Sequence, residues 1–198
     1  MNLDDIKRYQ AGDVEAFELL MREEKGRVMN MILRYIRLHD AAEDVFQDAW
    51  LQIWHKRGQL RNPAQFRAWM YRIVRNKIFE TLRSQNWKNE VMLFGSGHEE
   101  WDAVDPAQNA REALHNMQMM RRVNEEMELL EETEREALAL RFGSGLKFRE
   151  IAEVLNMPIG TVTVRTYQAL ALLAERLRRF EQTPPVTQDS KAQARERR

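Results

Sequence analysis

The sequence contains no cysteine among its 198 residues. That absence excludes a disulfide framework and any metal site built on thiolates, and it fits a reducing cytosol. Long apolar runs are also absent, and the longest is far too short to cross a membrane. The N-terminal stretch MNLDDIKRYQ lacks the basic-then-apolar plan of a signal peptide. We therefore expect a cytoplasmic protein with no membrane insertion.

Recognisable catalytic motifs are missing as well. The four histidines are scattered without metal-ligand spacing, and no glycine-rich loop could cradle a phosphate. Asp44 and Asp48 could be imagined as an acid/base couple, but nothing near them in the sequence suggests a substrate cleft. An enzyme on a helical scaffold is thus disfavoured, and we expect no catalytic residue, no cofactor and no metal.

Net charge is zero, with 31 basic and 31 acidic residues, but the charges are unevenly distributed. Residues 61–88 hold seven basic residues and one acidic residue, whereas residues 89–136 hold thirteen acidic and four basic residues. The screening length in physiological salt is about 8 Å, so each block acts on its own partner locally. A zero total therefore does not exclude a nucleic-acid partner.

Helical periodicity dominates, and no stretch alternates like a strand. The patterns predict an all-α fold of two small helical domains joined by a flexible acidic linker. We place the first domain at residues 1–84, the linker at 85–106, the second domain at 107–180 and a disordered tail at 181–198. The expected helices cover residues 12–38, 41–56, 64–84, a segment starting near 107, 133–142, 147–155 and 159–179.

The expected helix 41–56 has two unlike faces. At 100° per residue, one apolar face gathers Val45, Phe46, Ala49, Trp50, Ile53 and Trp54. The opposite face gathers Asp44, Gln47, Asp48, Leu51 and His55. This second face is either a solvated surface or a docking surface for a basic partner helix, and Leu51 among the acids hints at docking.

The stretch QFRAWMYRIVRNK, residues 65–77, mixes arginines and aromatics on one helix. Its apolar stripe predicts a core side made of Phe66, Met70, Ile73 and Val74. The other side gathers Arg67, Tyr71, Arg72, Arg75 and Asn76, with Trp69 at the border. Arginine neutralises phosphates, aromatic rings stack on unpaired bases, and an Asn amide can read a base edge. A basic amphipathic helix with buried aromatics is the alternative; the border position of the aromatics favours nucleic acid.

Residues 146–180 predict a helix-turn-helix, in which a short helix, a tight turn and a longer helix follow one another. Ile151, Ala152 and Leu155 would fill the inside of the first helix. Pro158 and Gly160 would shape the turn. The second helix would lie in a major groove with its early residues at base edges. An ordinary helical hairpin is the alternative.

The order of these segments resembles an extracytoplasmic-function sigma factor of the sigma-70 superfamily, over roughly residues 10–180. AAEDVFQDAWLQIW is similar to the family's core-binding signature. FRAWMYRIVRNKIFETLR is similar to the segment that reads the −10 element, and REALALRFGSGLKFREIAEVLNMPIGTV to the −35-reading domain. The resemblance implies a bacterial initiation factor that binds core RNA polymerase, recognises both elements and melts the −10 region.

The resemblance also implies roles for individual residues. Core polymerase would be bound through the coiled coil of its largest subunit by Asp44, Gln47, Asp48 and Leu51, and the polymerase flap would be a further contact of the factor. Single-stranded DNA at −10 would be held by Leu60, Arg67, Trp69, Tyr71, Arg72, Arg75, Asn76 and Lys77. Double-stranded DNA at −35 would be contacted by Arg149, Thr161, Thr163, Val164, Arg165, Tyr167 and Gln168. The acidic linker would thread through the polymerase.

The recognition helix departs from the family pattern. Thr163 and Gln168 stand where a cation is common, which predicts weaker or altered −35 binding, while the methyl groups of Thr163 and Val164 could meet thymine methyls. An anti-sigma factor is common in the family, but no residue here specifies one. A stand-alone helix-turn-helix regulator is the alternative function, and it leaves the helices 41–56 and 64–84 unexplained.

Overall fold

The structure is a computed structural model that describes residues 2–84 and 110–182. The expected linker 85–106 and residues 183–198 of the expected tail lie outside the described residues. Every regular element in the described ranges is helical, as the periodicity predicts. Among these residues no helix is long and apolar enough to cross a membrane.

The N-terminal part, residues 2–84, contains four α-helices and two short 3₁₀ turns. They are α1 (Leu3–Gln10), α2 (Val14–Leu33), α3 (His39–His55), η1 (Arg57–Gln59), η2 (Pro63–Gln65) and α4 (Phe66–Ser84). The sequence analysis missed α1, which is only two turns long and buries Ile6 and Tyr9. Gly12, with φ at +95°, separates α1 from α2, and the Asp13 side chain caps α2 by accepting from the Ala16 amide at 3.1 Å.

The C-terminal part, residues 110–182, contains the remaining elements. They are α5 (Ala110–Glu128), α6 (Glu132–Leu138), the π-helical turn η3 (Ala139–Gly143), α7 (Phe148–Leu155) and α8 (Ile159–Gln182). The helix α8 extends into the first two residues of the expected tail. Asn156 ends α7 in the left-handed conformation, at φ 52° and ψ 48°, which turns the chain sharply into α8.

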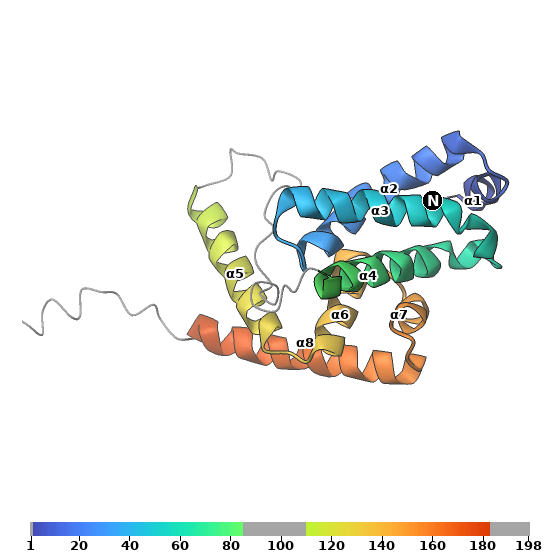
Figure 1. Cartoon of the computed structure of the whole chain (residues 1–198). Coiled ribbons are helices and arrows are strands. Elements are labelled where there is room, and N and C mark those ends of the chain that lie inside the picture. Colours follow the sequence, from blue (N-terminus) through green and yellow to red (C-terminus); the bar gives the residue numbers. More distant parts are fainter. Residues whose placement is uncertain (1, 85–109, 183–198) are drawn as a thin grey trace, which may run out of the picture.

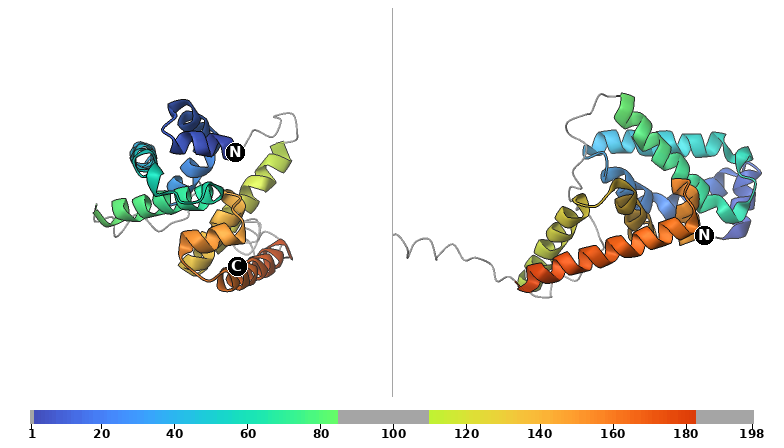
Figure 2. Two further views of the ribbon diagram at one scale, coloured as in Figure 1. Left: turned by 90° about the vertical axis from the view of Figure 1, so that its right-hand side faces the viewer. Right: turned by 90° about the horizontal axis from the view of Figure 1, so that it is seen from below.

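The two parts pack directly on each other. Helices α2 and α3 cover one side of α4, while α6 and α7 lie between α4 and the long α8 (Figure 1). The left view of Figure 2 shows the same order from another side. The largest cluster of buried apolar residues runs through both parts, joining the core of α1–α4 to residues of the C-terminal part: Ala137, Leu140, Leu146, Ile151, Ala152, Val154 and Val162. A second, smaller cluster lies within the C-terminal part and unites α5, α6 and α8.

Candidate nucleic-acid interface

Helix α3 presents the two faces that its spacing predicts. Val45, Ala49 and Ile53 are buried against the rest of the N-terminal part. The opposite face is exposed, with Leu51 at 57% exposure, and carries Asp44, Gln47, Asp48 and Leu51. This face brings two carboxylates, an amide and an exposed leucine together.

The aromatic residues of α4 lie elsewhere than the sequence analysis expected. Tyr71 is fully buried and Trp69 is 8% exposed, so neither offers a ring face to an unpaired base in this arrangement. The reason is a partner on α2: the Tyr71 hydroxyl donates to Glu24 Oε2 at 3.0 Å, inside the core. Burial, with the charge of Glu24 adding to it, raises the pKa of Tyr71 well above its usual range.

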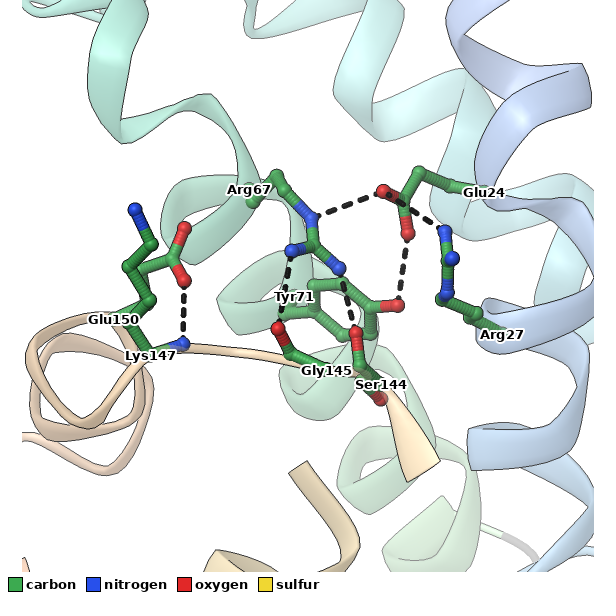
Figure 3. Close-up of polar contacts among 8 residues, drawn as sticks. All are labelled: Glu24, Arg27, Arg67, Tyr71, Ser144, Gly145, Lys147 and Glu150. Atoms are coloured by element: carbon green, nitrogen blue, oxygen red, sulfur yellow. Dashed lines mark hydrogen bonds and ion pairs between the residues drawn. The ribbon is translucent and has the colours of Figure 1, made fainter. Parts of the chain in front are cut away.

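Arg67 of α4 binds acceptors from both parts of the chain (Figure 3). Its Nε lies 2.9 Å from Glu24 Oε1, on a carboxylate that is itself buried. Its Nη2 donates to the Ser144 carbonyl at 2.6 Å, and its Nη1 to the Gly145 carbonyl at 3.4 Å. Gly145 adopts φ +66°, a conformation that favours glycine, just after the π-helical turn. The guanidinium therefore joins α2, α4 and the loop before α7.

Arg75, two turns further along α4, makes a two-pronged ion pair with Glu136 of α6. Nε and Nη2 of Arg75 each lie 2.9 Å from one carboxylate oxygen. The Tyr35 hydroxyl approaches the same carboxylate at 3.4 Å. Burial alone would lower the pKa of Arg75, but the hydrogen bond and the charge of Glu136 outweigh it and raise the pKa. This geometry is the strong, oriented form of an arginine–carboxylate pair.

Of the other residues predicted to bind the −10 element, two are exposed, one is paired with a carboxylate and one is buried. Arg72 and Asn76 are exposed on α4. Lys77 Nζ lies 2.9 Å from Asp48 Oδ2 on α3. Leu60 is buried, and its carbonyl accepts from Gln10 Nε2 at 2.6 Å, so the leucine side chain does not stand open at the surface.

The helix-turn-helix forms as the sequence predicts. Ala152 and Val162 are buried where α7 and α8 cross, and the Met157 amide donates to the Ala152 carbonyl at 3.0 Å across the turn. Pro158 accepts from the Val162 amide at 3.1 Å and so begins α8. The Glu150 carboxylate accepts from the Lys147 amide at 2.6 Å at the start of α7.

The −35 candidates are partly open. Val164 and Tyr167 are 54% and 59% exposed on α8, with Thr161 and Gln168 exposed beside them. The Arg149 side chain on α7 is exposed as well.

Two other −35 candidates on α8 bind within the protein. Arg165 reaches back to the start of α6, at 3.2 Å from Glu131 Oε2 and 3.0 Å from Thr133 Oγ1. The Thr163 hydroxyl donates to the Ile159 carbonyl at 2.8 Å within its own helix. Neither group points freely outward as α8 stands.

Four residues that organise this region were missed by the sequence analysis, namely Glu24, Glu136, Ser144 and Gly145. For Glu24 a signal existed. It stands one turn from Leu20 and one turn from Val28, both fully buried, so a carboxylate interrupts the apolar stripe of α2. A buried charged residue on such a stripe needs a partner, so the sequence predicted a hydrogen-bond donor such as arginine or tyrosine for Glu24 without saying which residue it is.

The sequence matches two family models and several curated proteins. Residues 20–88 match the family model described as Sigma-70 region 2, and residues 120–173 match Sigma-70, region 4. Among curated proteins, the RNA polymerase sigma-H factor of Pseudomonas aeruginosa is 28% identical over 172 residues, covering 83% of this chain and 87% of that protein. The ECF RNA polymerase sigma-E factor of Escherichia coli K12 is 29% identical over 168 residues, with the same coverage.

Two solved structures share the fold. CnrH in complex with the cytosolic domain of CnrY aligns with a TM-score of 0.61 at 21% identity, over 88% of this chain and 96% of that one. The sigma factor RpoE in complex with the anti-sigma factor NepR, from Bartonella quintana, aligns with a TM-score of 0.54 at 25% identity, over 81% and 94%.

Proposed function

Because this chain belongs to the sigma-70 family as an extracytoplasmic-function sigma factor, a non-enzymatic subunit for transcription initiation by RNA polymerase, we propose a division of labour between its surfaces. The N-terminal part binds core polymerase through α3 and the −10 element through α4. The C-terminal part reads the −35 element through α8. The family resemblance inferred from the sequence motifs is confirmed by both family models, and these finer roles build on it.

The exposed face of α3 carries the polymerase-binding role. Asp44, Gln47 and Asp48 stand out from the helix together with Leu51, while the opposite face holds the helix in the core. A stand-alone DNA-binding regulator would have no use for this acidic face with a leucine in it. That single observation favours a factor that binds to core RNA polymerase.

For the −10 element, the structure supports a revised set of contacts. Arg72 and Asn76 are exposed and could reach phosphate and base directly. Arg75 and Lys77 would join them after release from their carboxylates, and Arg67 after release from the carbonyls of Ser144 and Gly145. Trp69 and Tyr71 hold α4 in the core. Unpairing a base costs a few kcal/mol, which contacts to the separated strand would offset.

For the −35 element, the exposed face of α8 offers uncharged side chains, to which α7 adds Arg149. Val164 could meet thymine methyl groups, Tyr167 and Gln168 could reach base edges, and Arg149 could contact a phosphate. Thr163 and Gln168 stand where the family pattern commonly has a cation, and Arg165 is paired with Glu131, so this face offers fewer free cations than that pattern. Weaker binding of the −35 element by the factor alone follows.

An anti-sigma factor is a further proposed partner, because one of the solved relatives was captured with such a factor. We also propose a cytoplasmic location, because a sigma factor works on polymerase and chromosomal promoters.

The test is transcription in vitro with core polymerase from the source bacterium on a library of genomic fragments. We expect the full-length chain to direct initiation from a defined set of promoters. The double variant Asp44→Asn/Gln47→Ala should bind core polymerase at least tenfold more weakly while keeping its helical content. The control Glu18→Gln removes an exposed carboxylate from α2 and should behave as wild type. Unchanged core binding by the double variant would instead favour the stand-alone regulator.

A further inference from the structure

Two of the arginines proposed to hold nucleic acid on α4 already bind the other part of the chain. Arg75 is paired with Glu136 of α6, and Arg67 donates to the carbonyls of Ser144 and Gly145. We call these contacts the seam. A guanidinium that donates its N–H groups to a carboxylate or a carbonyl cannot donate them to a phosphate at the same time.

We propose that the C-terminal part inhibits the N-terminal part in cis, with Glu136 acting as a phosphate mimic on Arg75, and that polyanionic nucleic acid opens the seam by competing for Arg67 and Arg75. This inference rests on the proposed use of α4 for the −10 element. It adds a property that the family assignment does not specify: groups of the same chain compete with promoter DNA for Arg67 and Arg75.

The packing around the seam indicates that DNA and the C-terminal part cannot occupy this side of α4 at the same time. Helix α7 packs along α4, and Leu146, Ile151 and Ala152 are buried in the cluster that continues into the N-terminal core. The Gln65 amide at the start of α4 also donates to Glu153 Oε1 of α7 at 3.0 Å. A strand of DNA laid on this side of α4 would have to displace α7 as well as the carboxylate.

Glu136 is the residue on which the competition turns. It is 3% exposed, yet it is the acceptor for both Arg75 and Tyr35 of the N-terminal part. Arginine binds carboxylate and phosphate through the same fork of two N–H groups, so a phosphate oxygen pair can replace the Glu136 oxygens. Once the seam opens, the Glu136 carboxylate becomes exposed to water and the Arg75 guanidinium can bind DNA.

Glu24 has a different part in the same arrangement. It lies on α2, within the N-terminal part, and holds Arg67 Nε while leaving both Nη atoms to the carbonyls of the loop. Opening the seam releases those Nη donors but leaves the Glu24 contact intact. Glu24 is therefore a positioning residue that keeps Arg67 extended toward the DNA side.

The seam can be followed by fluorescence energy transfer, because the chain has no cysteine of its own. Dyes are placed at Glu18→Cys on α2 and Ala174→Cys on α8, both exposed positions. In this background Glu136→Gln should lower the transfer efficiency, with the ratio of open to closed molecules rising roughly tenfold, equivalent to about 1.4 kcal/mol. The matched control Glu134→Gln removes one carboxylate from the same helix, near its start, and should leave the transfer unchanged.

A second variant approaches the seam from the other side. Arg75→Gln alters the N-terminal part only, so it tests the contact even if Glu136→Gln folds poorly, and it should lower the transfer efficiency similarly. A single-stranded oligonucleotide of mixed sequence should open the wild-type chain, and should open Glu136→Gln at a roughly tenfold lower concentration. Wild-type transfer efficiency in both variants, or an oligonucleotide that binds without changing it, overturns the proposal.

These readouts are independent of polymerase. If the wild-type chain fails to start transcription with core enzyme while the transfer still responds to both variants, the proposed function is wrong and the seam remains. If transcription proceeds and the transfer never changes, the seam is wrong and the proposed function remains.

Discussion

Lys77 on α4 lies with its ammonium nitrogen 2.9 Å from the Asp48 carboxylate on α3, so one ion pair joins the proposed DNA-binding helix to the proposed polymerase-binding face. The Lys77 side chain is largely covered, whereas Asp48 is more than half exposed. A basic partner that docks on α3 would draw Asp48 away from Lys77. Binding of polymerase would then release a cation for the promoter.

Replacing Asp48 should separate these two roles. Asp48→Asn should lower the free energy of unfolding by at most about 1 kcal/mol, because a half-exposed ion pair contributes little. Binding of core polymerase should weaken several-fold, and binding of single-stranded DNA by the factor alone should strengthen modestly as Lys77 loses Asp48 and keeps only the 4.0 Å contact with Glu80. Asp44→Asn, on the same face, should weaken polymerase binding without strengthening DNA binding. Equal DNA affinities for the two variants would contradict the coupling.

The Tyr71–Glu24 hydrogen bond predicts a large cost for a small change. Tyr71→Phe leaves a buried carboxylate one donor short, which should lower the free energy of unfolding by about 1.5–3 kcal/mol. Denaturant titration followed by circular dichroism measures this loss.

Tyr167→Phe is the matched control, since it removes the same hydroxyl from an exposed ring on α8. It should change stability by no more than about 0.5 kcal/mol. Similar losses for the two variants would mean that the buried hydroxyl contributes nothing special.

Alkaline pH should destabilise the protein through its buried phenols. Burial raises the pKa of Tyr9, Tyr35 and Tyr71, with nearby carboxylate charge adding to the effect at Tyr35 and Tyr71. A pKa above that of the unfolded chain means that the stabilisation is complete below the unfolded value of about 10 and is lost as pH rises beyond it. Absorbance near 295 nm should show these tyrosines ionising only as the chain unfolds. Their ionisation in the native state at pH 10 would contradict the burial.

The exposed face of α8 predicts which side chains read duplex DNA. Tyr167→Ala and Gln168→Ala should each reduce affinity for a −35 duplex by roughly tenfold, in line with the loss of a base contact. Leu170→Ala is the control, because Leu170 is also an exposed side chain of α8 but is not among the proposed base contacts. Fluorescence anisotropy with a labelled duplex measures the affinities.

Arg149→Ala should act differently, by lowering affinity for all sequences and reducing the salt slope by about one. A sequence-dependent effect of Arg149→Ala would move it from phosphate contact to base readout.

What the sequence could reveal depended on the range of the interactions. The faces of α3 follow from helical spacing alone, because each side chain needs only a core to point toward. The helix-turn-helix is likewise local, since Ala152, Asn156 and Val162 all lie within one short segment of the chain. These features were predicted at nearly the observed boundaries.

The contacts of α4 were not predictable in the same way. Tyr71 and Arg67 are drawn inward by Glu24, which lies more than forty positions earlier, and Arg75 by Glu136, which lies sixty-one positions later. Helical spacing distinguishes faces but does not say which face a distant segment will cover. Arg165 shows the same limit, since its engagement with Glu131 and Thr133 depends on how α8 lies across α6.

The two parts that share one apolar cluster also share one polypeptide, so the closed fraction does not depend on the protein concentration. Because Glu136 and Arg75 belong to one polypeptide, the internal competitor is present at a fixed effective concentration that dilution does not change. Lowering the amount of protein in a cell or a cuvette therefore leaves the closed fraction as it was, whereas a separate inhibitor would dissociate. For the wild-type chain, the concentration and affinity of the ligand then decide when the molecule opens, independently of the protein concentration.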